Sequence, residues 1–309
     1  AHPWGYRNRI RLAFDPQGNP GYRGRRSHAV IPIRQCPIAA PLLVRAGVTA
    51  AEALKSFVPA LRAAELALFC NADETALLLT VFVASPAKIR FDEFAVALRA
   101  HIPQLVGAEL VIETAHQQPR ALARWGAAFL RYSAAGAEYR VDHGAFFQVN
   151  RWLVDALVER ATSEQRGALA WDLFAGVGLF ARRLAASFEQ VMAVESSPAA
   201  IAALEANLAG TPGAAVRAST LEFLRRNRTG APPDLVVVDP PRTGLGAEIT
   251  ALLAEIVPPD LVYVSCDPAT LARDLRALLA ASYGVESIAL VDLFPQTFHL
   301  ETVVRLHRA

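Results

Sequence analysis

The chain has 309 residues, of which 53% are hydrophobic and 19% charged, so it can bury a core and is not expected to be disordered. Its formal net charge of +2 excludes a uniformly basic protein but is compatible with a local basic surface. The three cysteines, at 36, 70 and 266, form no CxxC pair, which argues against a disulfide framework or a complete zinc site and suits a reducing, cytoplasmic compartment. No apolar run is long enough to span a membrane, and no secretory signal is expected.

Residues 1–140 predict a small α+β domain. Apolar alternations at 9–14 and 29–33 flank a run of turn residues and predict an antiparallel hairpin. Beyond it we expect a helix at about 49–62 with Thr49 as its N-cap, strands at 64–70 and 76–84, a helix at 91–102 and a strand at 108–113. Arginines with interleaved aromatic side chains crowd the first 26 residues, which suits phosphate contact and base stacking in RNA, although a solvated edge strand would look the same: Arg7, Arg9, Arg11, Arg23, Arg25 and Arg26.

Residues 141–309 predict a doubly wound α/β domain, because strand and helix patterns alternate strictly from about residue 150. Strands are expected at 169–174, 190–195, 214–218, 234–239 and 260–265, with two further strands at 285–293 and 301–307 that could form an antiparallel edge. Helices are expected at 178–187, 198–208, 219–226, 246–255 and 268–281. Ligands in such a sheet lie beyond the carboxyl ends of the strands, which directs attention to the residues that follow each strand.

The first two of these strands end in residues that suit a nucleoside. Gly176 and Gly178 allow a tight turn and close approach of the backbone to a ligand, and Asp172 just before them needs a partner if it is buried. Glu195 ends the next strand and could accept both ribose hydroxyls. The full GxGxxG pattern is absent because Ala181 takes its last position. The site therefore suits a dinucleotide, which has a pyrophosphate, less well than a methyl donor, which has none.

The next two strands end in residues that suit covalent chemistry. Asp239-Pro240-Pro241-Arg242 forms a rigid turn that presents carbonyls and a carboxylate, and Cys266 follows a central strand at a helix start, where the helix dipole favours a thiolate. Glu301 opens an apolar strand and is a candidate base, whereas His299 is either its partner or only a turn residue. The aromatic pair before Gln148, in FFQVN (146–150), suits stacking but would more often be packing.

Taken together, these motifs resemble those of the RNA uracil-5-methyltransferases. The matching segments are YRNRIRL (6–12), GYRGRRSH (21–28), QCPI (35–38), FFQVN (146–150), DLFAGVG (172–178), DPPRTGL (239–245), VSCDPATLARD (264–274) and FPQTFHLET (294–302). The resemblance implies a class I fold with a seven-stranded, mostly parallel sheet, S-adenosylmethionine as cofactor, Cys266 as the nucleophile that adds to uracil C6 and Glu301 as the base. It also implies that Gln148, Phe174, Glu195 and Asp239 line the cofactor site or its junction with the uracil, beside Gly176 and Gly178. Asp239, Pro240 and Arg242 would meet the uracil or RNA, and Arg7, Arg9 and Arg25 would contact RNA.

The sequence departs from the family pattern in three places. Many members carry an N-terminal β-barrel domain, and nothing like it is found before Tyr6 in this sequence; Leu179 stands where an asparagine is frequent. Cys36 looks like the last of four cluster ligands whose other three are missing, so either the chain is truncated or its line has lost the cluster, and a 4Fe–4S cluster is not expected in this chain. GYRGRRSH and QCPI favour ribosomal over transfer RNA as the substrate, and we expect a monomer. A transfer RNA uridine-5-methyltransferase, an RNA cytosine-5-methyltransferase and a non-catalytic RNA-binding relic are the alternatives. The second alternative usually carries a Pro-Cys motif that is not found, and Cys266 with Glu301 argues against the third.

Overall fold

The computed structural model describes residues 2–25, 27, 29–57, 63–85, 90–114 and 117–308, and the chain forms two compact units. Unit 1 contains Ala1–Tyr132, Asp142–Gly144 and Val149–Trp152, and unit 2 contains Ser133–Val141, Ala145–Gln148 and Leu153–Ala309. The boundary expected between residues 140 and 141 falls inside one strand, β9 (Ala137–Asp142), and the division into domains 1–140 and 141–309 stays a prediction.

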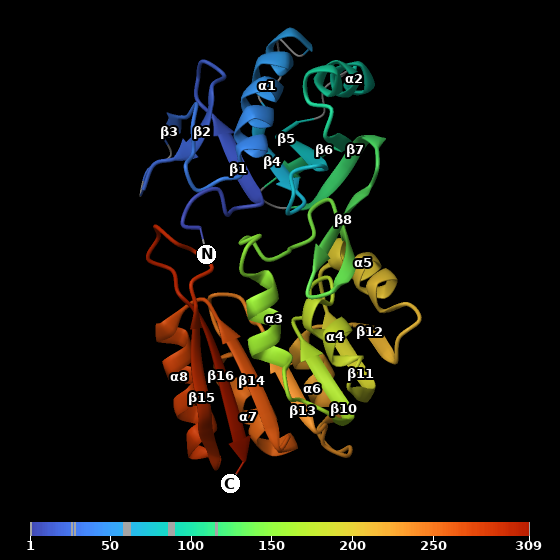
Figure 1. Ribbon diagram of the computed structural model, residues 1–309, viewed down its shortest axis with the longest axis vertical. Coiled ribbons are helices and arrows are strands. Elements are labelled where there is room, and N and C mark those ends of the chain that lie inside the picture. Colours follow the sequence, from blue (N-terminus) through green and yellow to red (C-terminus); the bar gives the residue numbers. More distant parts are fainter. Residues whose placement is uncertain are drawn as a thin grey trace. The chain divides into compact units, whose positions relative to one another are not determined.

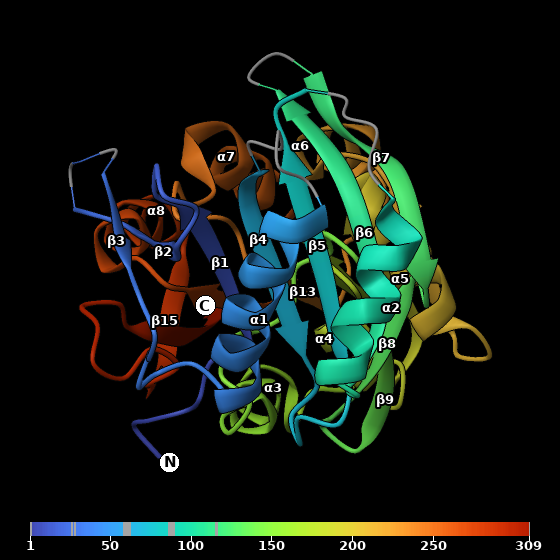
Figure 2. The ribbon, with the colours of Figure 1, turned by 90° about the horizontal axis from the view of Figure 1, so that it is seen from above.

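Unit 1 is built on a seven-stranded sheet in the order β3-β2-β1-β4-β5-β6-β7 (Figure 1). Its strands are β1 (Arg9–Phe14), β2 (Pro20–Arg23), β3 (Val30–Pro32), β4 (Ala63–Cys70), β5 (Leu77–Val83), β6 (Leu105–Thr114) and β7 (Gln117–Gly126). β5 and β6 are parallel, and the other neighbours are antiparallel. Figure 2 shows α1 (Pro41–Phe57) and α2 (Phe91–His101) on the same face of this sheet.

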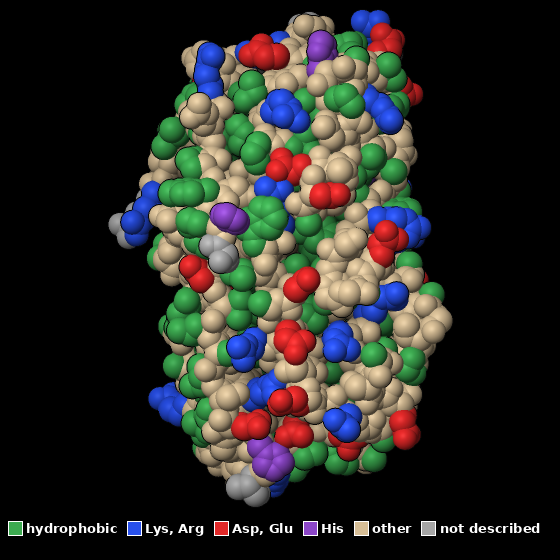
Figure 3. All heavy atoms as spheres, viewed as in Figure 1, with side chains coloured by type: hydrophobic (Ala, Val, Ile, Leu, Met, Phe, Trp, Pro, Cys, Tyr) green, Lys and Arg blue, Asp and Glu red, His purple; other side chains and the backbone are tan. Residues whose placement is uncertain are grey.

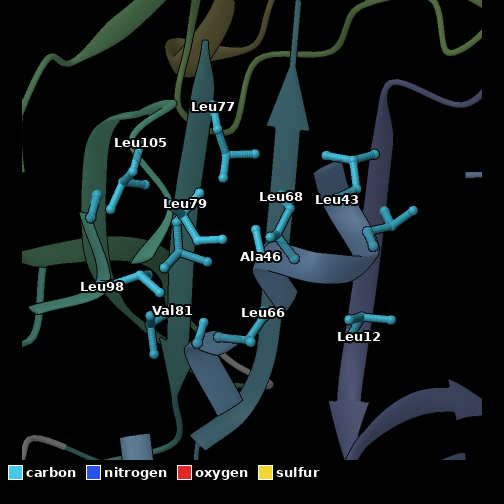
Figure 4. Close-up of a cluster of buried hydrophobic side chains, with 14 of the residues drawn as sticks. Leu12, Leu43, Ala46, Leu66, Leu68, Leu77, Leu79, Val81, Leu98 and Leu105 are labelled. Atoms are coloured by element: carbon cyan, nitrogen blue, oxygen red, sulfur yellow. The ribbon is translucent and has the colours of Figure 1, made fainter. Parts of the chain in front are cut away.

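The core of unit 1 lies between that face and the two helices, as the close-up in Figure 4 shows. Side chains at every second position of a strand point to one face, so alternate residues of β4 and β5 meet the helices. Burial of one such leucine contributes on the order of 1.5–3 kcal/mol. The cluster includes Leu12, Leu43, Ala46, Leu66, Leu68, Leu77, Leu79, Val81, Leu98 and Leu105.

The predicted start of the first helix is wrong. α1 begins at Pro41, and Thr49 lies in its interior, where the Thr49 hydroxyl donates to the Arg45 carbonyl at 2.9 Å. Proline suits the first turn of a helix. The Leu42 amide of that turn donates to the Glu74 carboxylate at 2.7 Å, so the N-terminus is capped from the β4–β5 turn and not by its own neighbour. The expected last turn, residues 58–62, lies outside the described residues.

The N-terminal hairpin contains a strand that the sequence pattern hid. β2 occupies part of the segment expected to be a turn, and it pairs with β1 on one side and β3 on the other. The pattern also gave no signal for β7, β8 (Phe129–Ala134), β9 or α3 (Val154–Thr162). β7 depends on its ladder with β6 and β8 on its ladder with β9, and a propensity scale does not record such pairing.

Unit 2 has the predicted doubly wound α/β architecture. Its sheet has the order β12-β11-β10-β13-β14-β16-β15, and β16 is antiparallel to both of its neighbours. The strands are β10 (Gly167–Leu173), β11 (Phe188–Glu195), β12 (Gly213–Arg217), β13 (Leu235–Val238), β14 (Asp260–Ser265), β15 (Tyr283–Val291) and β16 (Glu301–Arg308). The helices are α3, α4 (Leu179–Leu184), α5 (Pro198–Leu208), α6 (Thr220–Asn227), α7 (Gly246–Ile256) and α8 (Pro268–Ala280). The seven-stranded, mostly parallel sheet is therefore confirmed.

The buried sheet of unit 2 follows from its apolar strands. All four residues of β13, Leu-Val-Val-Val, are buried, as parallel strands covered on both faces require. The helices contact one another in two groups, α3 with α4 and α5, and α6 with α7 and α8. None of the helices within the described ranges combines the length and apolar character that a membrane crossing requires.

Candidate functional site

The loop between β10 and α4 is a tight turn that opens onto free space. Phe174, Gly176 and Gly178 all have positive φ values, of 65°, 56° and 88°. At Gly178 the φ of 88° favours glycine, and an added Cβ would also lie 2.7 Å from Leu204 Cδ1. At Gly176 no atom lies within 4 Å of the place a Cβ would take. The loop thus leaves room for a ligand beside its backbone.

Asp172 is buried with one oxygen unpaired. Its Oδ2 accepts from the Ala181 amide at 2.8 Å, while Oδ1 has no hydrogen-bond partner. Burial, followed by the charges of Asp239 and Glu195, raises the pKa of Asp172 to about 8. Three carboxyl groups that disfavour one another's ionisation would be relieved by a cation among them. A sulfonium cofactor supplies such a charge, so these residues fit S-adenosylmethionine.

Glu195, at the end of β11, holds the turn and the start of α5 together. Its Oε2 accepts from the Gly176 amide at 2.8 Å, and its Oε1 accepts from the Ser196 and Ser197 amides at 2.7 and 2.6 Å. Each carboxylate oxygen has two lone pairs, so Oε2 keeps acceptor capacity for a hydroxyl. The predicted ribose acceptor is therefore in a suitable place and is also a structural brace.

Asp239 and Gln148 meet at the end of β13. The Gln148 side-chain amide donates to Asp239 Oδ2 at 3.0 Å, and burial raises the pKa of Asp239. Gln148 is buried, as is Phe147 before it, whereas Phe146 is 56% exposed. The FFQVN segment therefore combines a buried ring at Phe147, an exposed ring at Phe146 and the Gln148 amide, which is directed at Asp239.

The turn at Pro240, Pro241 and Arg242 is tied to α8. The Gly244 amide donates to the Pro241 carbonyl at 2.8 Å, and the Thr270 hydroxyl donates to the Arg242 carbonyl at 3.0 Å. Arg273 donates to the Thr243 carbonyl at 2.7 Å. These hydrogen bonds from α8 hold the backbone of Arg242 in place.

Asp274 is the residue that joins α8, β14 and this turn, and the sequence analysis gave it no role. Its buried carboxylate accepts from the Leu245 amide at 2.7 Å, the Tyr263 hydroxyl at 2.8 Å and Arg273 Nε at 2.9 Å. An acid on the apolar side of a helix was the available signal, since buried acids need partners.

Cys266 and Glu301 face each other across neighbouring strands. β14 and β16 are antiparallel, and their register pairs Val264 with Val303 and Ser265 with Thr302. The same register, continued by one residue, sets Cys266 opposite Glu301. Directly opposed residues of an antiparallel pair have Cα atoms about 4.5–5.5 Å apart. The candidate nucleophile and the candidate base, 35 positions apart in the sequence, are thereby adjacent.

The ionisation of Cys266 differs from the expectation drawn from its helix. Burial and the Glu301 carboxyl raise the pKa of the Cys266 thiol, and Arg242 lowers it, chiefly through its positive charge. The helix amides are already taken, because Asp267 caps α8 and accepts from the Ala269 and Thr270 amides at 3.0 and 2.9 Å. Arg242 is thus the group that favours the thiolate.

Glu301 is 3% exposed at the start of β16. Burial and the charge of Asp239 raise the pKa of Glu301, so its carboxyl binds a proton more tightly than a free glutamate does. His299, two residues before it, contacts Arg242, with 2.9 Å between His299 Nε2 and Arg242 Nη2. Arginine can only donate, so Nε2 accepts and this ring nitrogen carries no proton.

The predicted RNA contacts Arg7, Arg9 and Arg25 all belong to unit 1. Arg25 is exposed, and the backbone of Arg7 bridges to Ala39 and Asn150. The Arg9 guanidinium lies 4.5 Å from the centre of the Phe69 ring, and burial lowers its pKa to about 10. Arg26 lies outside the described residues. The structure thus groups the predicted cofactor and catalytic residues in unit 2 and these arginines in unit 1.

Cys36, the candidate remnant of a cluster site, is half-buried, and its sulfur accepts from the Tyr22 hydroxyl at 3.5 Å. Within the part of the chain that the structure describes, no group of three His, Cys, Asp or Glu side chains could hold a metal.

The known proteins that this chain resembles are described as RNA methyltransferases. The family model of tRNA (Uracil-5-)-methyltransferases matches residues 232–309. An "Uncharacterized RNA methyltransferase" of Streptomyces avermitilis is 32% identical over 98% of this chain and 67% of its own length. The 23S rRNA (uracil(1939)-C(5))-methyltransferase RlmD of Shewanella piezotolerans is 31% identical over 97% of this chain and 69% of its own. The match to a further relative, from Streptomyces coelicolor, covers 64% of that relative's own length. The chain thus spans about two thirds of the length of these relatives.

Among solved structures, the tRNA (uracil-54, C5)-methyltransferase of Pyrococcus abyssi in complex with S-adenosyl-L-homocysteine has a TM-score of 0.80. It is 24% identical, and the match covers 99% of this chain and 76% of that one. This likeness establishes a shared fold.

Proposed function

This chain belongs to the family of S-adenosylmethionine-dependent RNA uracil-5-methyltransferases, and from that premise we propose that it methylates carbon 5 of a uridine in large-subunit ribosomal RNA. Cys266 is the covalent nucleophile and Glu301 the base. The observation that carries this proposal is the β14–β16 register, which sets the two residues opposite each other beside Asp239 and Arg242.

The residues at the carboxyl ends of β10, β11 and β13 would hold the cofactor. Glu195 would accept hydrogen bonds from its ribose hydroxyls, the turn through Phe174, Gly176 and Gly178 would contact it, and Asp239 and Gln148 would contact it near the uracil. The cofactor supplies an electrophilic methyl group on a positively charged sulfur. That positive charge would lower the pKa values of the neighbouring carboxyls, which burial has raised in the free protein.

Cys266 makes carbon 5 reactive. Its thiolate adds to C6 of the uracil ring, a carbon–sulfur bond forms, and the electron pair of the C5–C6 double bond moves into an enolate that makes C5 nucleophilic. Arg242 keeps part of the thiol ionised, chiefly through its positive charge. Because the base must reach these groups, the uridine is flipped out or already unpaired.

Glu301 completes the reaction once C5 carries its methyl group. Its carboxylate takes the proton from C5, the double bond forms again, and the bond between C6 and Cys266 breaks with its electrons returning to sulfur. A base works best with a pKa near the working pH, and burial beside Asp239 moves Glu301 in that direction. Asp239, Pro240 and Arg242 contact the uracil or its phosphate.

Arginines and aromatic rings hold the RNA. In unit 1 the arginines are Arg7, Arg9 and Arg25. Figure 3 shows acidic and basic side chains interspersed over the face in view, in keeping with the net charge of +2. Affinity is therefore expected from local phosphate contacts and stacking. All proposed catalytic residues come from one chain and the three cysteines are free, which supports a monomer in a reducing compartment such as the cytoplasm.

Ribosomal RNA is the preferred substrate because the relatives matched along most of this chain include a 23S ribosomal RNA enzyme. Transfer RNA is the second candidate, since the matching family model is described by a transfer RNA activity. Radiolabelled S-adenosylmethionine with unmodified 23S ribosomal RNA and with unmodified transfer RNA decides between them. Methyl transfer to transfer RNA alone would reject the ribosomal proposal.

The chemistry is tested by mass spectrometry after incubation with S-adenosylmethionine and RNA containing 5-fluorouridine. Fluorine at C5 cannot leave as a proton, so the reaction stops at the covalent complex. We expect an adduct on the peptide containing Cys266, its loss in Cys266→Ala and its retention in the matched control Cys36→Ser. An adduct that persists in Cys266→Ala would reject the assigned nucleophile.

A further inference from the structure

The loop between β15 and β16 (Figure 1) carries Phe298, whose ring lies in solvent. Phe298 is 88% exposed, and the next most exposed large apolar side chain among the described residues is Leu290, at 63%. Covering such a ring removes apolar surface from water, so a ligand that covers it gains free energy. Loops carried by a rigid sheet are also where binding residues are most often found.

The position of Phe298 is fixed by the turn that carries it. The Thr297 amide and hydroxyl both donate to the Phe294 carbonyl, at 3.1 and 2.7 Å, and the His299 amide donates to the Thr297 hydroxyl at 3.2 Å. Leu293 at one end of the loop and Glu301 at the other are buried. Hydrogen bonds therefore brace the residues on both sides of Phe298.

The His299 ring lies beside the Phe298 ring and leaves most of it exposed. The centre of the His299 ring lies 4.2 Å away, with an angle of 40° between the two planes. The Phe294 ring meets His299 edge-on at 5.7 Å. His299 thus backs Phe298, and the exposed face of Phe298 is open to a second flat group.

Phe298 is linked to the reacting groups by direct contacts. His299 accepts a hydrogen bond from Arg242 at 2.9 Å, and the charge of Arg242 lies close enough to the Cys266 thiol to lower its pKa. Along the chain, three residue steps separate Phe298 from Glu301, which limits the distance between their Cα atoms to about 11 Å at roughly 3.6 Å per residue. A flat group on Phe298 would therefore lie close to a uracil bound between Cys266 and Glu301.

We infer that Phe298, backed by His299, is a stacking platform for an unpaired nucleobase adjacent to the target uridine in RNA. This inference rests on the proposed function. A nucleobase suits the surface because it is flat and every base has a π-face, while the cationic Arg242 beside the platform suits the phosphate between the two nucleotides. The platform holds the neighbour in place after the target uridine has left the stack, and so assists presentation of the uridine to Cys266.

The test uses a short single-stranded RNA with randomised flanks, in which 2-aminopurine lies immediately 5′ or 3′ of a 5-fluorouridine. Stacking quenches the fluorescence of 2-aminopurine. In the complex trapped with the full chain and S-adenosylmethionine, one of the two positions should be quenched. Phe298→Leu should relieve the quenching, Phe298→Trp should keep it, and Val285→Ala should behave as the unsubstituted protein. Val285 is a matched control, since it is an exposed apolar residue toward the other end of β15.

Binding provides an independent measurement. The Kd for the same RNA, measured by fluorescence anisotropy, should rise roughly 5- to 150-fold in Phe298→Leu, the range expected for the loss of one base–aromatic stack. The rate of adduct formation at saturating RNA should change much less. Circular dichroism of each variant verifies that it folds.

The outcomes separate this inference from the proposed function. An unchanged Kd in Phe298→Leu, or 2-aminopurine that stays bright at both positions in the trapped complex, would overturn the platform while the adduct still supports the chemistry. Absence of an adduct would reject the proposed chemistry, and a Phe298-dependent Kd under those conditions would still support the platform. Equal loss of affinity in Val285→Ala would also overturn the platform, because any exposed apolar side chain would then serve.

Discussion

Replacement of Arg242 by glutamine should suppress the reactivity of Cys266 near neutral pH. Burial and Glu301 raise the pKa of this thiol, and the charge and the hydrogen bond of Arg242 oppose them. A hydrogen bond to a charged group contributes about 1.5–3 kcal/mol, so its loss should reduce the thiolate population at pH 7 roughly 10- to 150-fold. The remaining thiolate is more basic and more nucleophilic, with a Brønsted coefficient of about 0.4–0.5. Alkylation of Cys266 at pH 7 should therefore slow by roughly 3- to 20-fold.

The assay is the pH dependence of iodoacetamide alkylation without RNA or cofactor, read by peptide mass spectrometry for each cysteine. The sign follows from the thiol pKa: Arg242→Gln raises it further, so the variant is slower below that pKa. Well above the thiol pKa, where Cys266 is ionised in both proteins, the alkylation rate of the variant should equal or exceed that of the unsubstituted protein. Cys70 is a slow internal reference, because burial raises its pKa to about 12.

Arg276→Gln is the matched control. Arg276 is exposed on α8, about 12 Å along the helix axis from Pro268, where the helix begins, at about 1.5 Å per residue. This distance exceeds the screening length of about 8 Å at physiological ionic strength. Its profile should match that of the unsubstituted protein. Superimposable profiles for Arg242→Gln and the unsubstituted protein would refute the role given to Arg242, and a uniform loss of reactivity at every pH would indicate a disturbed fold instead.

Three further predictions concern the acidic residues of unit 2. Glu301→Gln should trap the methylated intermediate on ordinary uridine RNA, because an amide cannot take the C5 proton, so a denaturing gel should show RNA bound to the protein through Cys266; normal turnover would exclude Glu301 as the base. Asp172→Asn should flatten the pH dependence of stability. The folded carboxyl keeps its proton up to about 8 while the unfolded one loses it near 3.8, so the unsubstituted protein loses stability as pH rises through that window, by at most about 1.4 kcal/mol per pH unit; parallel urea-unfolding curves for the two proteins would contradict this. Asp274→Ala should destabilise unit 2 by about 2–5 kcal/mol, because two buried donors, the Leu245 amide and the Tyr263 hydroxyl, lose their acceptor at about 1–3 kcal/mol each. The control Glu248→Ala, which removes an exposed ion pair, should change the free energy of unfolding by no more than about 0.5 kcal/mol. Equal effects of the two substitutions in thermal unfolding would reject the role of Asp274.

The fold of unit 2 could be derived from the sequence because its signals are local. Apolar strands such as β13 alternate with helices bounded by glycine, proline and capping residues, so every helix from α4 to α8 and every strand of the sheet was anticipated to within a few residues. Unit 1 was less accessible. The start of α1 depends on Glu74 from another turn, and β2 and β7 exist through pairing with neighbours that sequence periodicity does not record.

The chemistry of the site divides in the same way. Residue type and position pointed to Cys266, Glu195 and Asp239 as candidates, because parallel strands bring their carboxyl ends to one edge. Glu301 was a candidate because an acid begins an otherwise apolar strand, which is antiparallel in the structure. Their ionisation could not be read from the sequence, since a pKa depends on burial and on charges from distant segments. The sequence predicted a thiolate favoured by the helix start, whereas in the folded chain Asp267 occupies those amides and Arg242 acts on the sulfur.

The sequence by itself therefore determined the α/β class, the order of the strands and of helices α4 to α8 in unit 2, and the candidates for the reactive side chains. Only the tertiary structure decided which of them meet. The antiparallel register of β14 and β16 sets Cys266 opposite Glu301, and the β15–β16 loop brings His299 to Arg242. The physical reason is that composition and periodicity act over a few residues, whereas hydrogen-bond ladders, burial and electrostatic fields join residues that lie far apart in the chain.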